Sequence, residues 1–482
     1  MTFAGRDLVS ITDFTNEEIE AVLDLADQMD SALKKGMEIE LCKGKDMATL
    51  FYEPSTRTRG SFERAMHKLG GTVISFAEAK VMSSAAKGET IADTVRVLRS
   101  YADIIVIRHP WDGAAKVAAD YAQVPVINAG DGSHEHPTQT LCDLYTLKKE
   151  KGRLKGLTVL LWGDLKYGRT VHSLIYALAR FGAEVLCAPL QGLDVPGPVL
   201  RRIHSEYNYM PERVKPDDMT SMIGEVDAFY IAPFKPYNLA LWSDFDSSPC
   251  PEISIREALR KADAIYVTRV QTERKDGPAD TESDGEYLTV DSKFLSQLKK
   301  KTLVMHPLPR TNELAYELDD YPTSVYFQQA AYGVPIRMAL TALLLGASNI
   351  ETPERTGVSL SDTAYDNYKQ VIGVKCPNAN CVSNRESHYL VPKLRMLKRN
   401  GGESLILRCV YCDHEMHPPY IASSEWHQGI LKNKKYYSSD SFMLDRIRSD
   451  NLIIFDSEKE AQAHGFMPSK RTVKQRNGGD AT

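Results

Sequence analysis

The sequence predicts an α/β protein with two doubly wound parallel-sheet domains and a small β-rich metal domain behind them. Short β-rich runs alternate with helical patterns from the start of the chain, and the alternation restarts after Gly156. Such alternation is typical of parallel sheets covered by helices on both faces. Four of the eight cysteines cluster between residues 376 and 412. The expected divisions are 1–150, 151–350 with a closing helix, a linker at 351–373, the metal domain at 374–425, and a small tail module with a disordered end at 426–482.

The first elements are a capped helix followed by strand and helix patterns in alternation. Thr15 and Glu18 have the spacing of a capping box in front of an apolar stripe. The β-rich runs that follow are 46–53, 71–76, 103–109 and 125–130, and the helical patterns are 58–70, 88–102 and 136–152.

The second series of elements begins at residue 157. Its β-rich runs are 157–164, 184–189, 264–270 and 302–309, with a helical pattern at 169–183 and a long apolar helix at 330–347. Ligands of doubly wound folds bind at the carboxyl ends of the strands, so functional residues are expected there.

Composition and charge place the chain among ordinary globular proteins. Its 482 residues fit roughly three domains at about 150 residues each. The net charge of -5 gives no support for a polybasic partner surface for nucleic acid or membrane. No apolar run approaches the roughly 20 residues that span a bilayer, and the first residues lack a signal-peptide pattern. A cytoplasmic protein without nucleic-acid or membrane partners is expected.

The run Ser55-Thr56-Arg57-Thr58-Arg59 joins a predicted strand to the next helix. Hydroxyls, a guanidinium and free backbone N–H groups at a helix N-terminus form an anion site that suits phosphate. Taken alone, the run is also compatible with an N-cap followed by a solvated basic turn.

Other strand ends carry similar groups, and their convergence favours a functional site over a set of solvated loops. The residues at or just after the ends of predicted strands are Arg108, His136, Gln139, Arg169, Arg269, Gln271, His306, Pro307 and Leu308.

These motifs resemble those of the aspartate and ornithine carbamoyltransferase family. The matching stretches, in order, are F-Y-E-P-S-T-R-T-R, R-H-P, H-P-T-Q-T-L-x-D-L, G-D-L-K-Y-G-R-T-V-H-S-L and M-H-P-L-P-R. The resemblance covers about residues 1 to 350 and is closest to the aspartate branch, since residues 268–274 read T-R-V-Q-T-E-R. It implies carbamoyl transfer from carbamoyl phosphate to L-aspartate, a step of de novo pyrimidine biosynthesis, without an organic cofactor.

The resemblance also implies a role for each motif residue. Those implied to hold the phosphate are Ser55, Thr56, Arg57 and Thr58. Those implied to stabilise the carbonyl oxygen are Thr58, Arg108 and His136, acting as an oxyanion hole. Those implied to hold the carbamoyl NH₂ are Gln139 and the backbone carbonyls of Pro307 and Leu308. Those implied to clamp the aspartate carboxylates are Arg169, Arg269 and Gln271.

Two further features follow from the resemblance. Ser83 and Lys87 match a family loop that reaches the active site of a neighbouring subunit, which implies a homotrimer with shared sites. Glu53 matches a glutamate that bridges to arginines of the second domain, here Arg169 and Arg274. For Glu53, a strand-end carboxylate that caps the next helix is an equally good interpretation.

The cysteine cluster has the pattern C-x₄-C-x₂₇-C-x₂-C, formed by Cys376, Cys381, Cys409 and Cys412. Two closely spaced pairs fit a closed tetrahedral Cys₄ zinc site, which is structural rather than catalytic. The surrounding sequence resembles the zinc domain of the aspartate carbamoyltransferase regulatory chain. One zinc ion per chain and a larger assembly of trimers are therefore expected.

Three alternatives stay open at this point. One is a carbamoyltransferase for ornithine or a related amine, and another is a non-catalytic zinc-ribbon binding protein. A dinucleotide oxidoreductase is less compatible, because the run W-G-D-L-K-Y-G-R lacks the G-x-G-x-x-G spacing. Residues 231–254 read as an inserted loop, and no role is assigned to this loop or to the tail.

Overall fold

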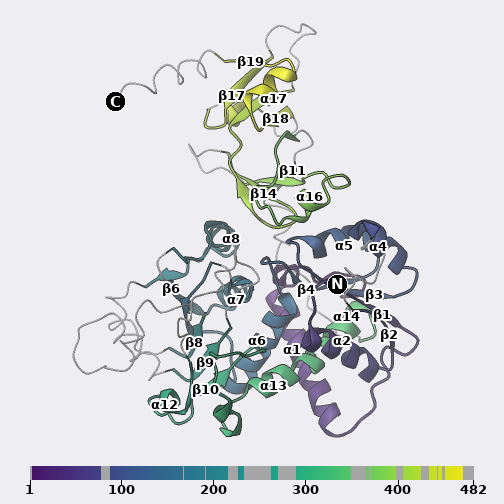
Figure 1. The fold of residues 1–482 in the computed structure, drawn as a ribbon, viewed down its shortest axis with the longest axis vertical. Coiled ribbons are helices and arrows are strands. Elements are labelled where there is room, and N and C mark those ends of the chain that lie inside the picture. Colours follow the sequence, from purple (N-terminus) through teal and green to yellow (C-terminus); the bar gives the residue numbers. More distant parts are fainter. Residues whose placement is uncertain are drawn as a thin grey trace, which may run out of the picture. The chain divides into compact units, whose positions relative to one another are not determined.

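The structure is a computed structural model. Its residues form two compact units, each with many contacts within itself. Unit 1 comprises Met1–Pro110 and Ala118–Arg355, and unit 2 comprises Trp111–Val117 and Thr356–Thr482 (Figure 1). The residues that the structure describes are 3–77, 87–166, 168–189, 192–214, 226–232, 262–269, 289–348, 365–367, 371–397, 405–424, 434–441, 443–447 and 451–469.

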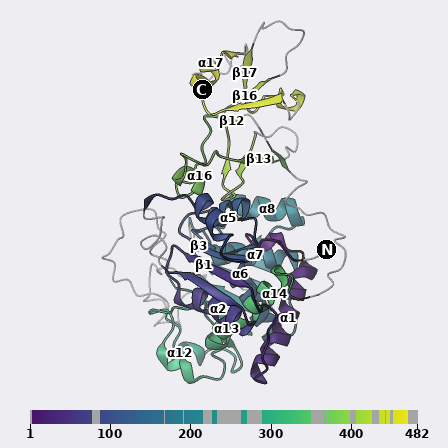
Figure 2. The ribbon, with the colours of Figure 1, turned by 90° about the vertical axis from the view of Figure 1, so that its right-hand side faces the viewer.

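The first sheet of unit 1 has the order β2-β1-β3-β4, and its neighbouring strands are parallel. Its strands are β1 (Asp46–Phe51), β2 (Thr72–Phe76), β3 (Ile104–His109) and β4 (Val126–Asp131). The helices of this region are α1 (Asn16–Lys34), α2 (Thr56–Lys68), α4 (Ile91–Leu98), α5 (Ala114–Ala122) and α6 (Pro137–Lys151). The strand order reverses between β1 and β3, which lie side by side in both views (Figures 1 and 2). Their carboxyl ends therefore form a topological switch point.

The second sheet of unit 1 has the order β10-β9-β8-β5-β6-β7 and is also parallel. Its strands are β5 (Thr158–Gly163), β6 (Glu184–Pro189), β7 (Glu212–Arg213), β8 (Ala228–Ile231), β9 (Ala264–Val267) and β10 (Leu303–Met305). The helices of this part are α7 (Arg169–Arg180), α8 (Gly197–Tyr207), α12 (Ser292–Leu295), α13 (Tyr326–Ala331) and α14 (Gly333–Leu344). Here the order reverses between β5 and β8.

Apolar cores cover both faces of the second sheet. Along β5, Leu161 belongs to one buried cluster, whereas Leu160 and Trp162 belong to the other. This alternation follows from the two-residue period of a strand. Helix α14 packs against α1 and α2, so the end of unit 1 closes over helices from its beginning.

The helix starts follow local sequence. The Thr15 hydroxyl accepts a hydrogen bond from the backbone N–H of Glu18 (3.2 Å), and the Glu18 carboxylate accepts one from the N–H of Thr15 (2.8 Å). The predicted capping box is thus confirmed. Short 3₁₀ helices cover Ile11–Asp13, Tyr316–Asp320 and Leu444–Arg446. Within the described ranges, no helix has the length and apolarity that a membrane crossing requires.

The described residues of unit 2 form two small sheets. The first has the order β11-β13-β14-β15, with β11 (Tyr365–Asn367), β13 (Leu394–Leu397), β14 (Leu407–Cys409) and β15 (Glu415–Met416). The second has the order β12-β18-β16-β17-β19, with β12 (Val371–Ile372), β16 (Tyr420–Ser423), β17 (Lys435–Ser438), β18 (Leu452–Phe455) and β19 (Met467–Pro468). The described α-helices that lie wholly within unit 2 are α16 (Val382–Arg385) and α17 (Glu458–Ala463).

The predicted fold class, two parallel α/β domains and a β-rich C-terminal region, is confirmed. Two details differ from the expected divisions. Strands β11 and β12 lie within the expected linker, and β16 pairs with both β17 and β18. The expected boundary at residue 425 therefore runs through one sheet, because its strands are too short for period-2 patterning to reveal their partners. Most of the expected insert at 231–254 and the last residues of the tail lie outside the described residues.

Candidate active site and metal centre

A cavity of about 430 Å³ in unit 1 collects residues from the ends of several strands. The predicted site residues that line it are Ser55, Thr56, Arg57, Thr58, Arg108, His136, Gln139, Arg269, Pro307 and Leu308. They lie at or just after the carboxyl ends of β1, β3, β4, β9 and β10, so the topology brings together residues that are far apart in the sequence. The cavity includes the switch point between β1 and β3.

Other predicted residues are not placed in this cavity. Lys87 is exposed and is not among the lining residues. Arg169 is the first residue of α7, the helix that follows β5. Its side chain, Ser83 and Gln271 are not among the parts of the chain that the structure describes. The positions of these three side chains therefore stay predictions.

One end of the cavity is strongly cationic. Helix α2 begins at Thr56, and the hydroxyl of its N-cap residue, Ser55, makes no capping hydrogen bond. Desolvation, followed by the positive charges of Arg269 and Arg108, lowers the pKa of Arg57. Repulsion among three guanidinium groups beside a helix N-terminus is relieved by a bound anion. This end of the cavity can therefore hold a phosphate group.

Arg108 and His136 form the adjoining wall, and both are buried. Arg108 donates from Nη1 to the carbonyl oxygen of Ala129 (3.3 Å) and forms an ion pair through Nη2 with Glu53 Oε2 (3.0 Å). Glu53 lies beyond the end of β1, where Phe51 is in register with Arg108. The neighbouring strand therefore supplies this partner. The predicted ion pairs between Glu53 and the side chains of Arg169 and Arg274 stay a prediction, because these two arginine side chains are not among those that the structure describes.

The turn after β10 is held by the imidazole of His306, which is fully buried. The backbone N–H of Leu308 donates to His306 Nδ1 (2.8 Å), so Nδ1 is an acceptor and the proton is on Nε2. His306 Nε2 then donates to Glu313 Oε1 (2.9 Å). Burial lowers the pKa of His306, which favours the neutral ring. Leu308 has φ of +52°, a left-handed conformation that is unusual for leucine and occurs mainly where neighbours enforce it.

Sequence reasoning missed Arg337, which lines the same cavity from α14. Its side chain is buried, and Nη1 donates to the carbonyl oxygen of Gly333 (2.9 Å). The guanidinium carbon lies 4.9 Å from the centre of the Phe62 ring. The available signal was a single cation within an otherwise apolar helix, because a buried charge is rare unless it has a partner or a function.

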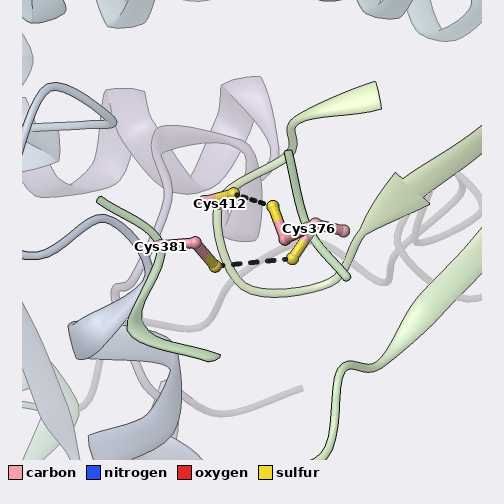
Figure 3. A group of neighbouring side chains, drawn as sticks. Cys376, Cys381 and Cys412 are labelled. Atoms are coloured by element: carbon pink, nitrogen blue, oxygen red, sulfur yellow. Dashed lines mark hydrogen bonds between the residues drawn. The ribbon is translucent and has the colours of Figure 1, made fainter. Parts of the chain in front are cut away.

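Unit 2 contains the cluster of four cysteines, all of them buried. The Sγ atoms lie within 4.8 Å of one another, with 3.5 Å between Cys376 and Cys412 and 3.8 Å between Cys381 and Cys409. Figure 3 shows the side chains of Cys376, Cys381 and Cys412 close together. Four sulfurs bound at about 2.3 Å to a tetrahedral zinc ion would be about 3.8 Å apart. The donor set and its spacing thus fit a closed tetrahedral metal site.

The loop between the first two cysteines is fixed by hydrogen bonds within unit 2. The Asp112 carboxylate accepts bonds from the side-chain amides of Asn378 (2.7 Å) and Asn380 (3.1 Å). The Asn384 amide donates to the carbonyl oxygens of Cys376 and Asn378, both at 2.8 Å. These contacts hold the loop in the conformation that brings the two thiols together.

Three family models match the chain. Residues 6–149 match the carbamoyl-phosphate-binding domain of aspartate/ornithine carbamoyltransferases, and residues 247–344 match their aspartate/ornithine-binding domain. Residues 369–421 match the metal-binding domain of the aspartate carbamoyltransferase regulatory chain. Both α/β domains and the cysteine domain thus have counterparts in one enzyme system.

Individual relatives of the chain are also aspartate carbamoyltransferases. The aspartate carbamoyltransferase catalytic subunit of Thermoplasma acidophilum is 44% identical over 342 residues, covering 71% of this chain and 99% of that protein. A structure of the Methanocaldococcus jannaschii catalytic subunit is 41% identical, with a TM-score of 0.55 over 71% of this chain and 98% of that one. The Trypanosoma cruzi enzyme in complex with N-(phosphonacetyl)-L-aspartic acid is 35% identical, with a TM-score of 0.56 and coverage of 71% and 96%.

The α/β part therefore matches catalytic subunits along nearly their whole length, and the cysteine domain matches the metal domain of the regulatory chain. The chain belongs to the aspartate carbamoyltransferase family, as a catalytic chain fused to a regulatory-type metal-binding domain.

Proposed function

We propose that the protein transfers the carbamoyl group of carbamoyl phosphate to L-aspartate, forming N-carbamoyl-L-aspartate and phosphate as a step of pyrimidine biosynthesis. The observation that carries the proposal is the meeting of Arg57, Arg108 and Arg269 in one cavity with hydroxyls, an amide and a backbone turn. A related enzyme from Trypanosoma cruzi has been crystallised in complex with carbamoyl phosphate and aspartate.

The cationic end of the cavity would bind the phosphate of the first substrate. Ser55, Thr56 and Arg57 stand at the start of α2, where backbone N–H groups and the helix dipole favour an anion. The same contacts would stabilise the charge that grows on the phosphate as the C–O bond breaks. This end of the site thus serves both binding and departure of the leaving group.

The carbonyl carbon is attacked by the amine nitrogen of aspartate. Thr58, Arg108 and His136 line the cavity beside the phosphate end, where they would stabilise the oxyanion of the tetrahedral intermediate. No side chain needs to form a covalent bond to the carbamoyl group. Holding two reactants in the correct orientation and stabilising the oxyanion can supply most of the rate acceleration.

The second substrate distinguishes this reaction from carbamoylation of ornithine. Arg269 brings a positive charge into the cavity, and Arg169 and Gln271 are proposed to complete the clamp. A guanidinium attracts the side-chain carboxylate of aspartate and repels the ammonium of ornithine. The assembled cavity also favours an enzyme over a non-catalytic zinc-ribbon protein.

The direct test is product analysis with carbamoyl phosphate and either L-aspartate or L-ornithine. We expect carbamoylaspartate to form and carbamoylated ornithine to be absent at equal substrate concentrations. Formation of the ornithine product alone would move the chain to the other branch of the family, and formation of neither product would overturn the proposal.

We also propose that active sites are shared between chains of a homotrimer. Lys87 is exposed and lies outside the cavity of its own chain, as expected for a residue that serves a neighbouring subunit. Mixing an inactive Lys87→Ala variant with an inactive Arg57→Ala variant should restore part of the activity, because hybrid trimers contain some sites with both residues intact. Mass spectrometry would verify that the trimers have mixed. Mixed trimers that stay inactive would contradict shared sites.

A further inference from the structure

The carboxyl group of Asp143 lies behind the cavity and has no role in the reaction described above. It is on α6, one helical turn after Gln139, and it is almost completely buried. Its Oδ1 accepts hydrogen bonds from Gln139 Nε2 (2.9 Å), Gln329 Nε2 (3.0 Å) and the Tyr266 hydroxyl (3.1 Å). Three elements, α6, α13 and β9, thus meet at one oxygen atom.

The first of these bonds determines how the amide of Gln139 is oriented. An amide can present either its oxygen or its NH₂ group to the cavity, and the two differ by a simple flip. Because the NH₂ of Gln139 donates to Asp143, its oxygen is left for the cavity. An amide oxygen is the group required to accept a hydrogen bond from a carbamoyl NH₂.

The second bond connects Asp143 to the turn after β10, which also lines the cavity. Gln329 donates to Asp143 through Nε2 and accepts through Oε1 from the backbone N–H of His306 (2.9 Å). His306 in turn holds the N–H of Leu308. One carboxyl oxygen is therefore connected to the amide of Gln139 and to the turn that presents the carbonyls of Pro307 and Leu308.

We propose that Asp143 is a positioning residue that aligns the acceptors for the NH₂ group of the transferred carbamoyl unit. This inference rests on the proposed function, since it assigns Gln139 and the turn after β10 to that NH₂ group. Asp143 acts through Gln139 and Gln329 and does not touch the substrate. Its effect is to make the site distinguish a carbamoyl group from an acyl group of the same shape.

Asp143 Oδ1 can accept these hydrogen bonds whether the carboxyl group is ionised or neutral. Burial raises the pKa of Asp143 to about 7, although the hydrogen bonds from Gln139, Gln329 and Tyr266 lower it. Its other oxygen, Oδ2, is buried and accepts no hydrogen bond from a residue that the structure describes. Asparagine can present the same oxygen to the same donors, whereas alanine cannot.

The test compares carbamoyl phosphate with acetyl phosphate, which has a methyl group in place of the NH₂. In Asp143→Ala, we expect the ratio of the acetyl phosphate Ki to the carbamoyl phosphate KM to fall by on the order of 10-fold to 100-fold, as expected for loss of oriented hydrogen bonds. Binding of inorganic phosphate, measured by calorimetry, should stay unchanged. Asp143→Asn should keep most of the discrimination.

Two further variants separate positioning from loss of folding. Gln329→Leu removes the link to the turn and should also lower the ratio, even if Asp143→Ala proves too unstable to purify. Tyr266→Phe removes only the third donor to Asp143 and leaves the bonds from Gln139 and Gln329 in place, so it should keep most of the ratio. In a double-variant cycle, Gln139→Ala should add little to the effect of Asp143→Ala, because Asp143→Ala already leaves the Gln139 oxygen unaligned.

Each outcome is decisive. An Asp143→Ala enzyme that keeps the wild-type ratio would overturn the inference, and so would equal weakening of phosphate, acetyl phosphate and carbamoyl phosphate. Failure of the wild-type protein to form carbamoylaspartate would instead overturn the proposed function, so the two failures are distinguishable.

Discussion

Arg57→Ala should lower kcat by on the order of 10²-fold or more, because an oriented, partly desolvated cation would be removed from the group on which charge develops. Arg57 lies in the first turn of α2, and its pKa is lowered by desolvation and by Arg269 and Arg108. A cation in this environment is stabilised most by the substrate phosphate. Steady-state kinetics with both substrates varied would measure the loss.

Arg269→Ala is the matched control, since it also removes one guanidinium from the same cavity. It should raise the KM for aspartate strongly and leave carbamoyl phosphate binding nearly intact, because this side chain is proposed to hold the second substrate. A near-normal kcat in Arg57→Ala would refute the phosphate assignment. An equal loss of affinity for both substrates in Arg269→Ala would refute the division of roles.

Loss of the metal should have the second large effect. We propose that Cys376, Cys381, Cys409 and Cys412 bind one zinc ion per chain and that this ion folds the surrounding domain. Structural zinc contributes apparent folding free energy on the order of 10 kcal/mol or more. The strands around the site are two to four residues long, and such short strands form a stable domain only with additional constraints.

Cys409→Ser should therefore abolish stoichiometric zinc and unfold the cysteine loops, while catalytic trimers stay active. It should also lower the mass of any larger assembly, since this domain is proposed to hold trimers together. Metal analysis, size measurement with light scattering, and activity assays would follow the three effects. Cys42→Ser, which replaces a buried thiol outside the cluster, should change none of them. Wild-type protein without zinc, or an intact trimer without activity after zinc loss, would contradict the proposal.

The fold and most of the cavity follow from local patterns in the sequence. The alternation of β-rich runs and amphipathic helices predicts parallel sheets, and a parallel sheet places the carboxyl ends of its strands at one edge. Ser55 and Arg108, at neighbouring strand ends of the first sheet, could therefore be assigned to one site. Leu308 follows a strand of the second sheet, and the family resemblance was needed to assign it to the same site. The cysteine spacing predicted the metal centre in the same way, because two short loops suffice to present four thiols.

The remaining features depend on tertiary packing and have no local signature. Asp143 and Gln329 are 186 residues apart and meet only because α6 packs against α13. The pairing of Glu53 with Arg108 requires β1 and β3 to be neighbours in a given register. Strands of two or three residues, such as β12, are too short for an alternating pattern to be distinguished from chance.

The tautomer of His306 has a consequence for the response of the enzyme to acid. Its Nδ1 accepts from the backbone of Leu308, and a second proton would turn this acceptor into a donor facing another donor. Protonation is therefore opposed by burial and by the turn itself, and these effects outweigh the neighbouring Glu313 carboxylate, which favours the protonated ring. The reverse also holds: acid strong enough to protonate the ring would release Leu308 from its left-handed conformation. Inactivation at low pH would then reflect collapse of the carbamoyl-binding turn, with no need for a catalytic base that titrates in this range.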